Sequence, residues 1–137
     1  MQTPAEILSQ LAHCNYTEGY RFNALSKAAR VVYTDGVKRM MELCEAYWLF
    51  DLILSYQYKA KNNPMLREFQ VWELKVADRS AVVTCKDGNY DKPIFKQEIE
   101  FTDFPLSEMK VYLEQGWSSF GDNNPGEVLV AMLPSER

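Results

Sequence analysis

The feature that most constrains the fold is a change in hydrophobic period near residue 68. Before this point apolar side chains recur every three or four residues, as at Val37, Met40, Met41 and Cys44, which is typical of a helix. After it, apolar and polar residues alternate, as in "FQVWELKV" (69–76), which is typical of a strand with one buried face. The order predicts an α+β fold, with N-terminal helices packed on one face of an antiparallel sheet.

The helical half contains one dominant segment, "YTDGVKRMMELCEAYWLFDLILSYQ" (33–57). Thr34 or Asp35 can cap its start, and the turn-forming "KNNP" (61–64) can end it. We therefore expect one long central helix, whose broad apolar surface is covered by the sheet. A shorter helix is expected over "TPAEILSQLAHC" (3–14). Residues 15–33 are expected to hold a second short helix and then extended residues through Val31, Val32 and Tyr33.

The second half predicts about four to five strands. In "IFKQEIEF" (94–101) the alternation places Phe95, Ile99 and Phe101 inward. Residues 106–114 fit either a strand or a helix, and the alternation of Met109 and Val111 favours a strand. The C-terminal "LPSER" is compatible with a capping role for Ser135 or Glu136 and, alternatively, with recognition.

The length of the chain indicates the number of domains, and its net charge limits the kinds of partner it can bind. A chain of 137 residues fits a single globular domain, 1–137, and 13% aromatic residues argue for a packed core. The net charge is −4, which disfavours a broad phosphate-binding face and hence nucleic acid as a partner. Nucleic-acid binding could only use a basic set in the first half, namely Arg21, Lys27, Arg30, Lys38 and Arg39.

The three cysteines and the absence of a leader pattern predict a cytoplasmic protein. Cys14, Cys44 and Cys85 are odd in number and have no CxxC spacing, which suits a reducing compartment. The N-terminus lacks a basic stretch followed by a long apolar run. The most apolar run, 47–54, is too short to cross a bilayer, so no membrane partner is expected.

Neither a cofactor nor a metal is expected. A calcium-loop pattern over residues 87–98 fails because Lys92 stands where such a loop needs glycine. His13 is the only histidine, so the spacing supports neither a zinc site nor a nucleophile with a histidine base. Asp35, Asp51 and Asp103 are the carboxyl groups nearest apolar or aromatic residues. A helix cap for Asp35, a cap or turn for Asp103 and a hydrogen bond to a nearby polar group for Asp51 explain them better than catalysis.

The candidate binding residues are Tyr47, Trp48, Asp51 and Trp72. Tyrosine and tryptophan combine contact area with a polar group, although the spacing of these residues fits core packing better. We expect a non-catalytic interaction or accessory module whose partner is a protein. The alternative is a small-ligand-binding protein or enzyme with a pocket near Tyr47, Asp51 and Trp72. An edge strand is also compatible with a homodimer.

Five blocks occur in order along the chain: "YTDGVK" (33–38), "AYWLFDLILSYQ" (46–57), "FQVWELKV" (69–76), "FTDFPL" (101–106) and "LPSE" (133–136). Together they resemble an uncharacterised family of small bacterial and phage proteins, a domain of unknown function. The resemblance extends from about Tyr20 to the C-terminus. It implies no activity, ligand or catalytic residue, and it implies an accessory protein carried by a phage or mobile element.

Overall fold

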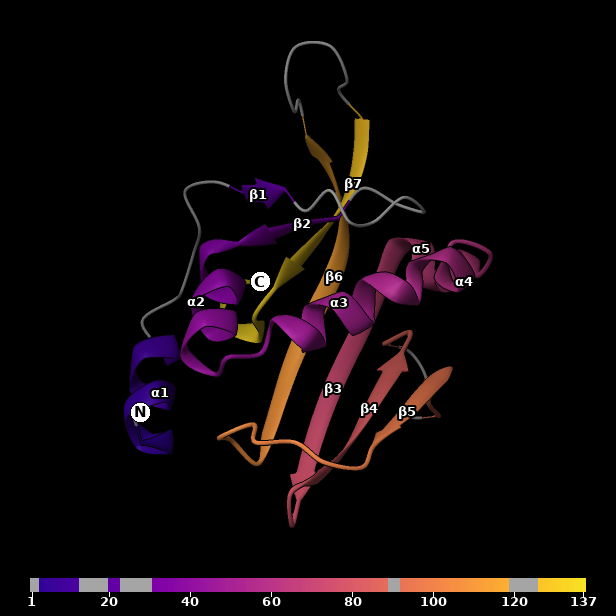
Figure 1. Ribbon diagram of the computed structural model, residues 1–137. Coiled ribbons are helices and arrows are strands. Elements are labelled where there is room, and N and C mark those ends of the chain that lie inside the picture. Colours follow the sequence, from indigo (N-terminus) through magenta and orange to yellow (C-terminus); the bar gives the residue numbers. More distant parts are fainter. Residues whose placement is uncertain (1–2, 13–19, 23–30, 89–91, 119–125) are drawn as a thin grey trace.

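The computed structural model describes residues 3–12, 20–22, 31–88, 92–118 and 126–137, which form two layers. Helices cover one face of a seven-stranded sheet with the strand order β1-β2-β7-β6-β3-β4-β5 (Figure 1). This arrangement confirms the α+β class and the packing of helices on one face. The elements are α1 (Pro4–Ala12), β1 (Tyr20–Phe22), β2 (Val31–Thr34), α2 (Asp35–Leu43), α3 (Tyr47–Ser55), α4 (Gln57–Ala60), α5 (Pro64–Glu68), β3 (Phe69–Ala77), β4 (Ser80–Lys86), β5 (Phe95–Ile99), β6 (Glu108–Ser118), β7 (Gly126–Met132) and the 3₁₀ helix η1 (Pro134–Glu136).

The sheet is larger than predicted and it is mixed. β2 pairs with β7 in parallel, whereas the other neighbouring strands are antiparallel. The prediction of four to five antiparallel strands was wrong because β1 and β2, in the mainly helical first half, also join the sheet. The extended conformation expected for Val31–Tyr33 is confirmed, since these residues lie in β2. β2 shows no alternation since both of its faces are buried: Val31 and Val32 point to opposite faces and are both 0% exposed.

The single long helix was also wrong, because the chain turns between α2 and α3. Glu45 adopts a left-handed conformation with φ of 51°. The Ala46 N–H donates to the Met41 carbonyl (2.9 Å), and the Glu45 N–H donates to the Glu42 carbonyl (3.4 Å). These two bonds form a Schellman motif, which ends a helix and usually has glycine at the left-handed position. Because position 45 is glutamate and not glycine, the sequence does not indicate that the helix ends there.

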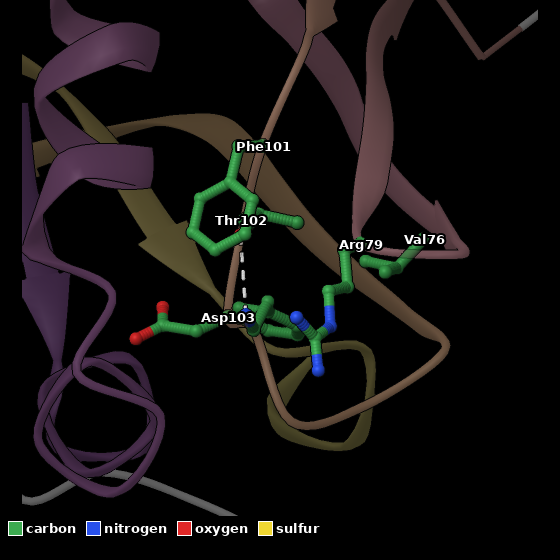
Figure 2. Close-up of a pocket in the computed structure, with 6 residues that line it drawn as sticks. Val76, Arg79, Phe101, Thr102 and Asp103 are labelled. Carbon is green, nitrogen blue, oxygen red and sulfur yellow. Dashed lines mark hydrogen bonds between the residues drawn. The ribbon is translucent and has the colours of Figure 1, made fainter.

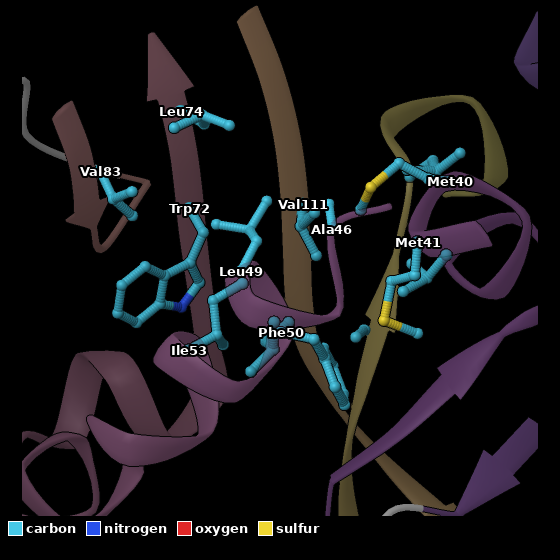
Figure 3. Close-up of a cluster of buried hydrophobic side chains, with 14 of the residues drawn as sticks. Met40, Met41, Ala46, Leu49, Phe50, Ile53, Trp72, Leu74, Val83 and Val111 are labelled. Atoms are coloured by element: carbon cyan, nitrogen blue, oxygen red, sulfur yellow. The ribbon is translucent and has the colours of Figure 1, made fainter. Parts of the chain in front are cut away.

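The main core lies between the helices and the sheet (Figure 3). Its helical side comes from α2 and α3, and its sheet side comes from the central strands. Trp72 and Leu74 of β3 contribute large side chains that are 2% and 1% exposed. The other labelled members of this cluster are Met40, Met41, Ala46, Leu49, Phe50, Ile53, Val83 and Val111.

Two finer sequence predictions had different outcomes. Residues 108–118 form β6, as the alternation favoured, and this strand pairs with β3 and β7. Phe101 does not point inward: β5 ends at Ile99, and the Phe101 side chain is 68% exposed. His13, Cys14, Asn89, Asp91 and most of the short helix expected within 15–33 lie outside the described residues.

Candidate functional site

A tight turn between β3 and β4 forms one wall of a surface pocket. Ala77 pairs with Ser80, so Asp78 and Arg79 alone connect the strands. Both connecting residues have positive φ, 51° and 68°, as a two-residue hairpin of type I′ requires. Neither is glycine, so each costs about 1 kcal/mol of backbone strain. Strain of this kind persists only where the surroundings fix the conformation.

The connection between β5 and β6 forms the opposite wall and is tied to this turn. The Thr102 N–H donates to the Arg79 carbonyl (2.7 Å), and the Phe104 N–H donates to Thr102 Oγ1 (3.1 Å). Thr102 and Phe104 are each 6% exposed, so this part of the connection is packed into the protein. Before Phe101, Ile99 pairs with Ala81 of β4. The backbone on both sides of Phe101 is therefore held in place although its ring is exposed.

The pocket between these walls has a volume of about 440 Å³ and opens to solvent. Figure 2 shows Arg79, Phe101 and Asp103 around it, with Val76 at the end of β3. A size of a few hundred cubic ångströms is that of small-ligand and side-chain pockets. The residues that line the pocket are Val76, Arg79, Phe101, Thr102, Asp103 and Phe104.

The pocket combines an exposed aromatic ring with a cation. The guanidinium of Arg79 forms no ion pair with any carboxylate of the described chain. Arginine binds carboxylates through two parallel hydrogen bonds, and aromatic rings offer apolar contact area. The pocket can thus accept an apolar group that carries a carboxylate nearby. Within the described ranges, no group of three or more His, Cys, Asp or Glu side chains is placed to hold a metal ion.

The four residues predicted from sequence do not share one surface. Tyr47 is 54% exposed and Asp51 is also exposed, one turn further along α3. Trp48 is half-buried against the core. Trp72 is 2% exposed, and its indole N–H donates to Gln70 Oε1 (2.8 Å).

Trp72 belongs instead to an aromatic cluster that supports β5. Its ring centroid lies 5.7 Å from that of Tyr56 and 6.3 Å from that of Phe95. The Tyr56 hydroxyl donates to Gln97 Oε1 (2.9 Å), which connects the helical layer to the same strand. The structure therefore gives Trp72 a packing role next to the edge of the sheet.

Sequence reasoning missed Arg79 and assigned Phe101 to the core. The signal present in the sequence was the two-residue connection "DR" (78–79), which lacks the glycine of most type I′ turns. The partner segment, "FTDF" (101–104), is more than twenty residues further on. Nothing local indicates that the two segments meet, because their contact depends on the pairing of β3, β4 and β5.

The buried thiols are unsuited to nucleophilic chemistry near neutral pH. Burial raises the pKa of Cys44 from 9.0 to about 11. Burial, and secondarily the negative charge of Asp87, raise the pKa of Cys85 well above its usual value. Since the thiolate is the reactive form, both groups are expected to react slowly in the folded protein.

These raised pKa values predict a loss of stability at alkaline pH. A thiol whose pKa is higher in the folded state stabilises the fold below its unfolded pKa, and this contribution is lost as pH rises through the folded value. The free energy of unfolding should therefore fall as pH increases from 9.0 towards 11. In thermal melts, Cys44→Ala should be less stable than the parent at neutral pH and should lose less stability over this range. Parallel pH profiles for the two proteins would contradict the assignment.

Together, the fold and the site define a two-layer α+β protein with a surface pocket at a strand turn. A family model covering residues 5–137 matches the chain, which belongs to the family of unknown function DUF6876. No curated protein and no solved structure matches it. None of the helices in the described ranges is long and apolar enough to cross a membrane.

Proposed function

We propose that this protein is a non-catalytic interaction module that holds a segment of another protein in the pocket beside Phe101 and Arg79. The observation that carries the proposal is the 68% exposure of Phe101 on a backbone fixed by the Thr102 hydrogen bonds. Exposed aromatic rings on rigid supports are typical anchors of protein interfaces. The proposal agrees with the accessory role that the resemblance to phage and mobile-element proteins implies.

The chemistry of the pocket selects the kind of segment. An aliphatic or aromatic side chain would pack against Phe101 and Val76, and an adjacent Asp or Glu would pair with Arg79. Arg79 has no ion-pair partner among the described residues, so binding would not break an ion pair within them. The expected partner is therefore a protein with an exposed acidic and apolar sequence.

A selection from a displayed random-peptide library tests the proposal without a known partner. The immobilised protein should enrich peptides that contain an apolar residue next to Asp or Glu. Phe101→Ala should abolish binding of the selected peptides, and Arg79→Gln should remove the preference for the acidic residue. Tyr58→Ala, at a side chain that is 60% exposed on α4, and Lys61→Gln are matched controls. Enrichment that does not depend on Phe101 and Arg79 would exclude this pocket.

A small-ligand site near Tyr47, Asp51 and Trp72 is the alternative proposal. It is supported by the exposure of Tyr47 and Asp51 on α3, with Trp48 beside them. Thermal-shift screening against nucleotides, sugars and amino acids would test it, because a ligand that binds only the folded state raises the melting temperature. A shift that disappears in Asp51→Asn and persists in Phe101→Ala would favour this site over the pocket.

A further inference from the structure

We propose that β5 pairs with β5 of a second copy of this chain, so that two sheets join into one. β5 stands at the end of the strand order and has β4 as its only neighbour among the described strands. A strand in this position presents unpaired backbone N–H and C=O groups along its outer side. This inference concerns the sheet edge and does not depend on what the pocket binds.

The side chains of β5 are complementary to themselves when two copies run antiparallel. The strand reads Phe95, Lys96, Gln97, Glu98, Ile99. If a two-fold axis passes at Gln97, each Lys96 faces Glu98 of the other copy and each Phe95 faces Ile99. Directly opposite side chains in antiparallel strands lie close enough to interact, so this register forms two ion pairs and two apolar pairs.

Lys96 and Glu98 are exposed, and no oppositely charged side chain of the described residues pairs with them. On β4, Lys96 lies opposite Thr84 and Glu98 lies opposite Val82. Neither charge takes part in an ion pair with another described residue. By contrast, Glu73 in the centre of the sheet pairs with Lys75 and Lys110, both at 3.6 Å. The edge strand thus carries two charges that a second copy can neutralise.

The charges also select the register. A two-fold axis at Lys96 would place two lysines opposite each other, and an axis at Glu98 would place two glutamates opposite each other. Like charges at directly opposite positions destabilise strand pairing. Of these three registers, the one centred on Gln97 alone pairs opposite charges within β5 and places no like charges opposite each other. It also covers Phe95 and Ile99, which are half-buried at the edge.

The side of β5 that carries Phe95, Gln97 and Ile99 is fixed by contacts with Tyr56. Phe95 stacks near Tyr56, with ring centroids 5.0 Å apart, and Gln97 accepts a hydrogen bond from the Tyr56 hydroxyl. These contacts fix the strand from the helical layer, and none of the described strands lies along its outer side (Figure 1). A prearranged strand loses less conformational entropy when it pairs.

Charge exchange tests the proposal, with self-association measured by analytical ultracentrifugation over a range of concentrations. The parent protein should form dimers. Lys96→Glu and Glu98→Lys each convert both ion pairs into like-charge pairs, so each should raise the dimer dissociation constant by about tenfold or more. The double variant restores both pairs in reversed order and should dimerise like the parent.

Mixing the two single variants provides the most specific result. One chain then carries two acidic residues and the other two basic residues at positions 96 and 98, so the equimolar mixture should form heterodimers more strongly than either variant self-associates. Lys61→Glu, a charge reversal after α4, should leave dimerisation unchanged. A parent that stays monomeric at every concentration, or dimers that ignore all these exchanges, would overturn the proposal.

Discussion

Replacing Gln70 with Leu should cost about 3 kcal/mol of unfolding free energy, because it breaks a buried network in which each amide is satisfied. Gln57 and Gln70 are 1% and 0% exposed, and each donates to the side-chain oxygen of the other at 2.9 Å. Gln70 also donates to the Leu66 carbonyl (3.0 Å) and accepts from the Trp72 indole (2.8 Å). In Gln70→Leu, the Gln57 amide and the Trp72 N–H lose these partners inside the core.

A double-mutant cycle measured by chemical denaturation separates this network from simple packing. Gln57→Leu should also destabilise strongly, and the double variant should lose clearly less than the sum of the two single losses, since no unpaired amide remains. Gln115→Leu, at an exposed position on β6, is the matched control and should change stability by no more than about 0.5 kcal/mol. Additive losses at positions 57 and 70 would mean that the reciprocal amide contact contributes nothing specific.

The network shows what the hydrophobic pattern can and cannot predict. The alternation that placed Trp72 and Leu74 on one face of β3 was correct, and both are in the core. The same alternation puts Gln70 on that face, where a polar residue would be expected to remain solvated. Its burial depends on a second glutamine thirteen residues earlier, and this pairing is visible only once α4 lies over β3.

The errors in the predicted fold have two physical causes. One is an unusual residue at the end of a helix, and the other is pairing between strands that are distant in sequence. Glu45 ends α2 in a conformation that usually indicates glycine. β2 is apolar on both faces because it joins β7, almost 100 residues later, in parallel. Local period therefore identified β3, β5 and β6, but it did not show that the short extended segment at Val31–Tyr33 belongs to the sheet.

The candidate site was less predictable than the fold for the same reason. Tyr47, Trp48, Asp51 and Trp72 were selected because they are aromatic or charged within apolar segments. These criteria do not predict exposure: Tyr47 is exposed on α3, the adjacent Trp48 is half-buried, and Trp72 on β3 is buried. The pocket depends instead on the exposed Phe101 ring, which is positioned by strand pairing between residues distant in sequence. The alternation of β5 continues through Phe101 in the sequence, so the pattern predicts that this side chain is buried.

The C-terminal "LPSE" and the "YTDG" segment before α2 form one structural unit. Glu136 accepts hydrogen bonds from the Thr34 hydroxyl (2.6 Å), the Gly36 N–H (3.2 Å) and the Leu133 N–H (2.9 Å). Thr34 Oγ1 in turn accepts from the Val37 N–H (3.3 Å). Of the capping role considered for Ser135 or Glu136, the structure shows that of Glu136, and the element it caps is the N-terminus of α2, about 100 residues away.

Glu136→Ala should therefore lower the unfolding free energy by about 2 kcal/mol. The change leaves the Thr34 hydroxyl, which is 1% exposed, and the Gly36 N–H without this acceptor. Glu136→Gln should lose less, because its amide oxygen can still accept one or two of the three bonds while its NH₂ group cannot accept. Chemical denaturation of the two variants measures the difference, and Ala and Gln variants of equal stability would argue against a role for the carboxylate.

Gly36 gives the sharpest test of this contact, because the effect of replacing it should change sign. A Cβ at position 36 would lie 2.4–2.7 Å from the Glu136 carboxylate, so Gly36→Ala must displace that group and should destabilise the parent. In the Glu136→Ala background no carboxylate is present to displace. Alanine favours a helix over glycine by about 1 kcal/mol, so Gly36→Ala should then stabilise the protein. Equal effects of Gly36→Ala in both backgrounds would contradict the close approach of Glu136 to Gly36.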